Sequence, residues 1–192
     1  MPELVLSTRN QHKVREFNGL LGGWIVLPLP EQVELPPETG TSFAENALIK
    51  ARTAAAATGM TAIADDSGIS ARSLGGAPGV YSARYAGTGA TDEANLDKLM
   101  RELAKTGDPS VEYVCAIAYV EPSGEERVFE GRCAGVMIGE KRGAGGFGYD
   151  PAVVPDDYDD GRTMAELTQE EKDAISHRGR AARKLLAWLD SL

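Results

Sequence analysis

The chain has 192 residues, of which 42% are hydrophobic and 26% are charged, a composition typical of one globular domain and not of a disordered or fibrous protein. Its formal net charge of −9 argues against a general nucleic-acid-binding protein, because such proteins use an excess of Lys and Arg to release counterions from phosphates. An anionic ligand therefore requires a local cationic pocket.

Two kinds of segment are not expected in this sequence. No apolar run approaches the roughly 18 residues that span a membrane. The first residues contain no basic stretch followed by an apolar run, so we expect no secretory signal. We therefore expect a cytoplasmic protein in which Cys115 and Cys133 are reduced and pack as small hydrophobic residues in strands.

The first half of the chain predicts alternating strands and helices. In order, these are a buried strand at 4–6, a helix with Val14, Phe17 and Leu21 on its apolar side, a strand at 24–27, a loop at 31–40, a helix from Ser42 to near Gly59, and a strand at 61–64. Ser42 and Glu45 have the spacing of a capping box, which marks a helix start. The strand at 61–64 should present Asp65 and Asp66 at its C-terminal end.

The second half predicts a hairpin and a helical C-terminal region. In order, the elements are a Gly-rich loop at 75–89, a helix from Thr91 to about Leu103, paired strands at 111–120 and 126–138, a Gly-rich loop at 143–148, a capping box at Thr168 and Glu171, and a last helix with Ala182, Leu185, Leu186 and Leu189 on one side. Strands that alternate with helices before a hairpin indicate an α/β fold with a mixed sheet.

Two segments suit a phosphate and a cation. The strand-to-helix turn at 7–13 combines free helix N–H groups with Thr8, Asn10 and Lys13, although Asn10 could equally be a simple N-cap. Asp65 and Asp66 need partners or a bound cation such as Mg²⁺ if they are buried, whereas an Asx turn is the alternative. Because successive strand side chains face opposite sides, the two carboxylates need not bind the same ion.

Two further segments place cations beside apolar surfaces. Lys50 lies four residues after Asn46 on the apolar side of an Ala-rich helix, where its charge reaches either water or a phosphate. Arg178 continues the apolar seam of the last helix, so it requires either a core ion pair or a bound anion or base. Residues 146–151 offer glycines for close backbone approach to such a ligand and aromatic rings for base stacking.

Taken together, these segments resemble the inosine triphosphate pyrophosphatase (Ham1-like) family. The resemblance is carried by six ordered blocks at 7–13, 42–51, 64–68, 75–85, 145–151 and 176–178. It implies a Mg²⁺-dependent enzyme that hydrolyses the noncanonical purine nucleotides ITP, dITP and XTP to the nucleoside monophosphate and pyrophosphate, which cleanses the nucleotide pool. It also implies a cytoplasmic homodimer and a single domain over residues 1–192, with a two-lobed, three-layer α/β fold around a long mixed sheet and a substrate cleft between the lobes.

The resemblance further implies roles for individual residues. Asp66 matches the general base, and the metal ligands would be Asp66 with Glu38 or Glu45. The substrate-binding residues form a triphosphate set, Thr8, Asn10, Lys13, Lys50 and Ser67, and a base set, Phe147, Gly148, Tyr149, Asp150, Lys172, His177 and Arg178. Arg9 departs from the family pattern, because many relatives have glycine at this position in the phosphate loop.

The implied chemistry is consistent with phosphoryl displacement, which needs charge neutralisation and a positioned water. Donors from His177 and Arg178 that face a 6-oxo group would meet another donor in adenine, so the site would reject that base. The alternatives are a Maf-type pyrophosphatase for modified pyrimidine nucleotides, which the ending at 177–178 disfavours, and a non-catalytic nucleotide-binding module. The second is disfavoured by the Asp65–Asp66 pair beside cationic residues.

Overall fold

The computed structural model describes residues 1–192, apart from the side chain of His12. Its strands form one mixed sheet in the order β2-β1-β3-β4-β5-β6. The strands are β1 (Glu3–Leu6), β2 (Ile25–Pro28), β3 (Ala62–Ala71), β4 (Ser110–Val120), β5 (Glu126–Met137) and β6 (Val153–Pro155). β1 pairs in parallel with β2 and β3, whereas β5 and β6 are antiparallel, which confirms the predicted α/β fold with a mixed sheet.

Five α-helices and three short 3-10 helices accompany these strands in the described chain. They are α1 (Gln11–Leu20), α2 (Phe43–Thr58), α3 (Asp92–Leu103), α4 (Gln169–Ile175), α5 (His177–Leu189), η1 (Arg72–Leu74), η2 (Gly79–Arg84) and η3 (Asp150–Ala152). Within the described residues, no helix is long and apolar enough to cross a membrane.

The chain divides into two compact units. Unit 1 comprises Met1–Asp66, Cys115–Gly131 and Arg178–Leu192, and unit 2 comprises Ser67–Val114 and Arg132–His177. The long strands β3, β4 and β5 contribute residues to both units. Chain neighbours such as His177 and Arg178 therefore belong to different units.

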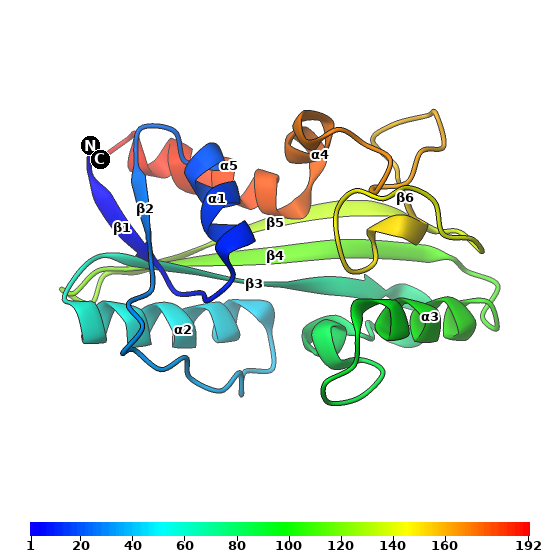
Figure 1. Ribbon diagram of the computed structural model, residues 1–192, viewed down its shortest axis with the longest axis horizontal. Helices are drawn as coiled ribbons and strands as arrows, with labels where there is room; N and C mark the ends of the chain where they lie inside the picture. The colour runs from blue at the N-terminus through cyan, green and yellow to red at the C-terminus, as the bar shows by residue number, and fades with distance from the viewer. The chain divides into compact units, whose positions relative to one another are not determined.

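Unit 1 has three layers, with α1 and α5 on one side of its strands and α2 on the other (Figure 1). Side chains along these strands alternate between the two cores that result. Leu4 and Leu6 of β1 pack in the core formed with α1 and α5, which includes the fully buried Phe17. Val5 points the other way and packs with the Ala-rich side of α2, including Ala51. Small alanine side chains allow this helix to lie close to the sheet, so the helix positions Asn46 and Lys50 near β3.

Unit 2 has its own core around α3. Leu96, Leu99 and Leu103 of this helix pack with Ile69 of β3 and Val111 of β4. The helix begins after Thr91, whose side chain accepts a hydrogen bond from the N–H of Ala94. The predicted helix from Thr91 to Leu103 is therefore confirmed.

Most local signals in the sequence correspond to the observed elements. Val14, Phe17 and Leu21 are buried as predicted for the first helix. Ser42 caps α2, and the helix ends at Gly59 in the left-handed conformation, with φ of 65°. Other confirmed predictions are the hairpin of β4 and β5, the capping box at Thr168 and Glu171, and two buried free cysteines in strands.

The predicted end of the third strand is wrong. β3 continues to Ala71, so Asp65 and Asp66 lie inside the strand and not at its end. In the described chain, β1 pairs with β3 at Ala62 and Ile63 and then ends at Leu6, while β4 flanks the other edge of β3. The two carboxylates therefore lie just beyond the β1 pairing, next in the fold to the turn that starts α1. The Asp-Asp-Ser-Gly sequence suggested a turn, but the long sheet keeps it extended.

Candidate active site

The turn from β1 into α1 has the geometry of a capped helix start. The Thr8 hydroxyl accepts a hydrogen bond from the N–H of Asn10 at 3.1 Å, and the Asn10 side chain accepts one from the N–H of Lys13 at 3.4 Å. Asn10 is thus an N-cap, one of the two interpretations of the sequence. The helix start still favours an anion, because its N–H groups and dipole present positive charge.

Arg9 has a structural function in the same turn. Its guanidinium donates to the backbone carbonyls of Leu29 and Pro30 at 2.8 and 3.0 Å, and it also contacts the carbonyls of Glu31 and Val33. These bonds connect the turn between β1 and α1 to the loop after β2. No described residue other than glycine has positive φ, so arginine fits the backbone at this position without left-handed strain.

Asp65 joins two of the predicted cations. One carboxylate oxygen accepts from Lys13 Nζ at 2.9 Å, and the other accepts from Arg178 Nε at 3.1 Å. Burial disfavours the charged form, but the nearby Lys13 and Arg178 hold the pKa of Asp65 well below its usual range. Arg178 also pairs with Glu16 at 3.1 Å, so the structure shows a core ion pair for this arginine.

Asp66 lies on the opposite side of β3 in a different polar group. It accepts a hydrogen bond from Asn46 Nδ2 at 2.9 Å and lies 3.8 Å from Lys50 Nζ. Lys50 also contacts Glu38 at 2.7 Å. Burial raises the pKa of Asp66, which Lys50 and Asn46 oppose. An elevated pKa suits a carboxylate that accepts a proton during a reaction.

The two predicted metal-binding glutamates differ in position. Glu38 lies beside Lys50 and Asp66, whereas the exposed Glu45 accepts hydrogen bonds from the N–H and hydroxyl of Thr41 at the start of α2. In the described part of the chain, no group of three or more His, Cys, Asp or Glu side chains is arranged to hold a metal ion. Glu38 and Asp66 nevertheless provide two carboxylates, which fit a Mg²⁺ that also binds substrate phosphates.

In unit 2, the predicted base-binding residues gather around Asp150. This buried carboxylate accepts from Lys172 Nζ at 2.6 Å, from the hydroxyl of Tyr113 at 2.9 Å and from the N–H of Phe147 at 3.0 Å. A Cβ on Gly146 would overlap the Asp150 carboxylate and lie 3.0 Å from Lys172 Nζ, so only glycine fits there. The Gly-rich loop is therefore shaped around this ion pair.

The aromatic residues of unit 2 lie in three different environments. Phe147 is 57% exposed, and Lys172 Nζ lies 5.0 Å from the centroid of its ring. The His177 ring stacks on Tyr113 with centroids 4.9 Å apart. Tyr149 is buried, and its hydroxyl donates to the carbonyl of Ser82 at 2.6 Å. Phe147 thus presents aromatic surface, whereas His177 is buried against Tyr113 and Tyr149 anchors the loop.

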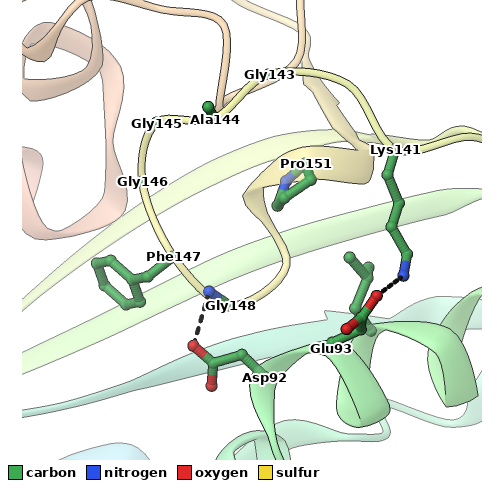
Figure 2. Close-up of a pocket in the computed structure, with 11 residues that line it drawn as sticks. Asp92, Glu93, Lys141, Gly143, Ala144, Gly145, Gly146, Phe147, Gly148 and Pro151 are labelled. Atoms are coloured by element: carbon green, nitrogen blue, oxygen red, sulfur yellow. Dashed lines mark hydrogen bonds and ion pairs between the residues drawn. The ribbon is translucent and has the colours of Figure 1, made fainter.

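Figure 2 shows a pocket of about 400 Å³ in unit 2, between the loop at 143–148 and the start of α3. Asp92 accepts a hydrogen bond from the N–H of Gly148 at 3.1 Å, and Lys141 contacts Glu93 at 3.0 Å. The Phe147 ring extends from the loop away from Lys141. The start of α3 therefore anchors the loop that carries the exposed aromatic ring.

The sequence did not assign individual functions to three residues that the structure places in these groups: Glu16, Asn46 and Tyr113. Asn46 had a usable signal, because it shares the buried side of α2 with Lys50. Ser67 is half-buried in β3 next to Asp66, as its place in the chain requires. Glu16 and Tyr113 act through partners far away in the sequence, so local spacing carried no signal for them.

Comparison with known proteins supports the predicted resemblance. A sequence model described as the Ham1 family matches residues 4–188. The dITP/XTP pyrophosphatase of Desulfotalea psychrophila is 45% identical, covering 99% of this chain and 89% of its own, and that of Bacillus licheniformis is 47% identical, covering 99% of each. Among solved structures, the chain is similar to a HAM1 protein from Coxiella burnetii, with a TM-score of 0.92 and 41% identity over 100% of both chains. The Staphylococcus aureus Ham1 protein matches with a TM-score of 0.90 and 40% identity over 98% of each chain.

Proposed function

The chain belongs to the Ham1 family, and we propose that it is a hydrolase that cleaves ITP, dITP and XTP to the nucleoside monophosphate and pyrophosphate. Its relatives named dITP/XTP pyrophosphatases match nearly the full chain. The observation that carries the proposal is the arrangement of Asp66, Lys50 and Glu38, in which a buried carboxylate of raised pKa lies beside a cation and a second carboxylate.

In the proposed reaction, Asp66 accepts the proton of the water that attacks the α-phosphorus. Lys13 and Lys50 neutralise charge on the triphosphate, while Thr8 and Asn10 form the turn that receives it, with Ser67 alongside. Negative charge on the transferring group develops where these cations lie, so they stabilise the transition state more than the ground state. Asn46 donates to Asp66 and so keeps its carboxylate oriented.

We further propose that Asp66 and Glu38 hold Mg²⁺. The bound ion would neutralise phosphate charge and lower the pKa of an attacking water. Glu38 is the better second ligand, because its carboxylate already shares Lys50 with Asp66, while that of Glu45 is used at the start of α2.

The members of the base set that lie in unit 2 provide the proposed specificity. Phe147 offers an exposed aromatic face for stacking, His177 contributes a buried ring stacked on Tyr113, and the Lys172–Asp150 pair offers a fixed polar edge. Gly148 and Tyr149 hold the loop through Asp92 and Ser82. Donors that meet a 6-oxo group leave an adenine amine without an acceptor, which costs binding free energy. Arg178 is a further proposed base-binding residue, and the proposed active protein is a cytoplasmic homodimer.

The proposal is tested by incubating the protein with Mg²⁺ and ITP, dITP, XTP, GTP or ATP and by identifying the products. We expect pyrophosphate and a monophosphate, with ITP, dITP and XTP preferred. Asp66→Asn should abolish turnover while nucleotide binding stays measurable. Release of orthophosphate, equal rates with ATP and ITP, or a near-normal rate for Asp66→Asn would each contradict the proposal.

A further inference from the structure

One buried carboxylate holds two cations to which the proposed function gives different tasks. Asp65 accepts from Lys13 of the triphosphate set through one oxygen and from Arg178 of the base set through the other, at 2.9 and 3.1 Å. Building on the proposed function, we propose that Asp65 is a positioning residue that holds Lys13 and Arg178 in their binding positions together. Recognition of phosphate and recognition of the base then depend on the same side chain.

Asp65 has no direct part in the reaction in this proposal. Its carboxylate is 1% exposed, and each of its oxygens already accepts from a cation. Asp66, the next residue, faces the opposite side of the strand and contacts Asn46 and Lys50. The adjacent carboxylates are therefore divided between proton transfer and the positioning of cations.

Lys13 keeps donors that a substrate could use, and Arg178 is held in a fixed orientation. The Lys13 side chain is 23% exposed, and an ammonium group has three donors, so it can bind a phosphate while it remains bonded to Asp65. Arg178 is oriented at two points, through Nε by Asp65 and through Nη1 by Glu16. Since a guanidinium is planar and rigid, these two contacts fix the plane of the Arg178 side chain.

Glu16 provides the matched control for this proposal. It forms an ion pair with Arg178 at 3.1 Å, as Asp65 does, whereas the ion pair of Lys13 is with Asp65. Glu16→Gln should therefore disturb the base set only, whereas Asp65→Asn should disturb both sets. A variant that had only lost stability would not affect phosphate binding and base binding differently.

The experiment measures the binding of two probes by calorimetry in the full-length protein with Mg²⁺ present. Inorganic tripolyphosphate reports on Lys13, and inosine, which has no phosphate, reports on Arg178. We expect Asp65→Asn to raise both dissociation constants about tenfold, since each cation loses a charge-assisted bond. Glu16→Gln should raise the constant for inosine and leave that for tripolyphosphate within about twofold.

Unchanged constants for folded Asp65→Asn would overturn the proposal, as would an effect on one probe only. If Asp65→Asn does not fold, the same measurements are made on Lys13→Met. This variant removes the ion pair of Asp65 with Lys13 and keeps the one with Arg178. That variant should alter inosine affinity about threefold or more, and an unchanged value would overturn the proposal. These readouts need no turnover, so absence of ITP hydrolysis by the wild type would refute the proposed function separately.

Discussion

Asn46 bridges Asp66 and the loop that carries Glu38. Its Nδ2 donates to the Asp66 carboxylate at 2.9 Å, and its Oδ1 accepts from the N–H of Gly40 at 2.8 Å. A Cβ on Gly40 would lie 2.7 Å from that same Oδ1, so glycine is needed for the contact. One buried amide therefore fixes the position of the proposed base relative to the loop of its proposed metal partner.

Asn46→Ala should lower kcat about 10- to 100-fold with little change in KM, because a bond to a charged group orients Asp66. Steady-state kinetics with ITP check this. The control is Asn18→Ala, which also removes a bridging amide in unit 1, between α1 and β2. That variant should lose thermal stability and keep its kcat, and equal kinetic losses in both variants would contradict a specific role for Asn46.

Replacement of the two glutamates separates the metal site from the helix cap. Glu38→Gln should weaken the binding of Mn²⁺, measured by electron paramagnetic resonance as a Mg²⁺ substitute, about tenfold or more. Glu45→Gln should leave Mn²⁺ affinity unchanged and lower the melting temperature, since Glu45 contacts Thr41 at the start of α2. The reverse result would assign the metal to Glu45.

Tyr113→Phe isolates one bond to Asp150. The phenylalanine ring keeps the stacking on His177 but loses the hydroxyl that donates to Asp150 at 2.9 Å. We expect KM for ITP to rise about 3- to 10-fold while kcat is retained. Tyr119→Phe, which removes a hydroxyl bonded to Glu121 in unit 1, is the control and should leave KM unchanged.

Two glycines should respond to alanine in opposite directions. At Gly68 a Cβ would overlap the Ser82 hydroxyl and lie 2.7 Å from the carbonyl oxygen of Gly79, so Gly68→Ala should destabilise the protein by about 1–3 kcal/mol. Around Gly19 in α1 there is open space, so Gly19→Ala should stabilise it by about 0.5–1 kcal/mol. Chemical denaturation measures both free energies of unfolding, and changes of the same sign would show that the space around each glycine does not decide the effect.

The start of α4 should show a pH-dependent contribution to stability. Hydrogen bonds from Arg162 lower the pKa of Glu171 from 4.5 to about 2. A depressed folded-state pKa adds stability above the unfolded value, and this is lost as the pH falls from about 4.5 to about 2. The melting temperature of Glu171→Gln should therefore lie below that of the wild type at pH 7 and converge with it near pH 2. Glu170→Gln, in the same turn, controls for loss of one charge at the helix start.

Local sequence determined the secondary structure at most positions. Ser42, Thr91 and Thr168 begin helices because each side chain accepts a helix N–H, and Gly59 ends one because it adopts positive φ. The shared side of Asn46 and Lys50 follows from helical spacing alone. The family resemblance likewise depended on short blocks of residues in a fixed order.

Only the tertiary structure decided which charges pair. Arg178 lies 113 residues from Asp65 in the chain and 162 from Glu16, so no local pattern predicts their contact. Likewise, β3 extends past Asp65 and Asp66 because its neighbours in the sheet keep it extended, although the local sequence favours a turn. Helix caps and turns depend on neighbouring residues, whereas a buried ion pair depends on which strands and helices the sheet brings together. The net charge of −9 followed from the sequence, but the small cationic groups around Asp65 and Asp66 exist only in the folded chain.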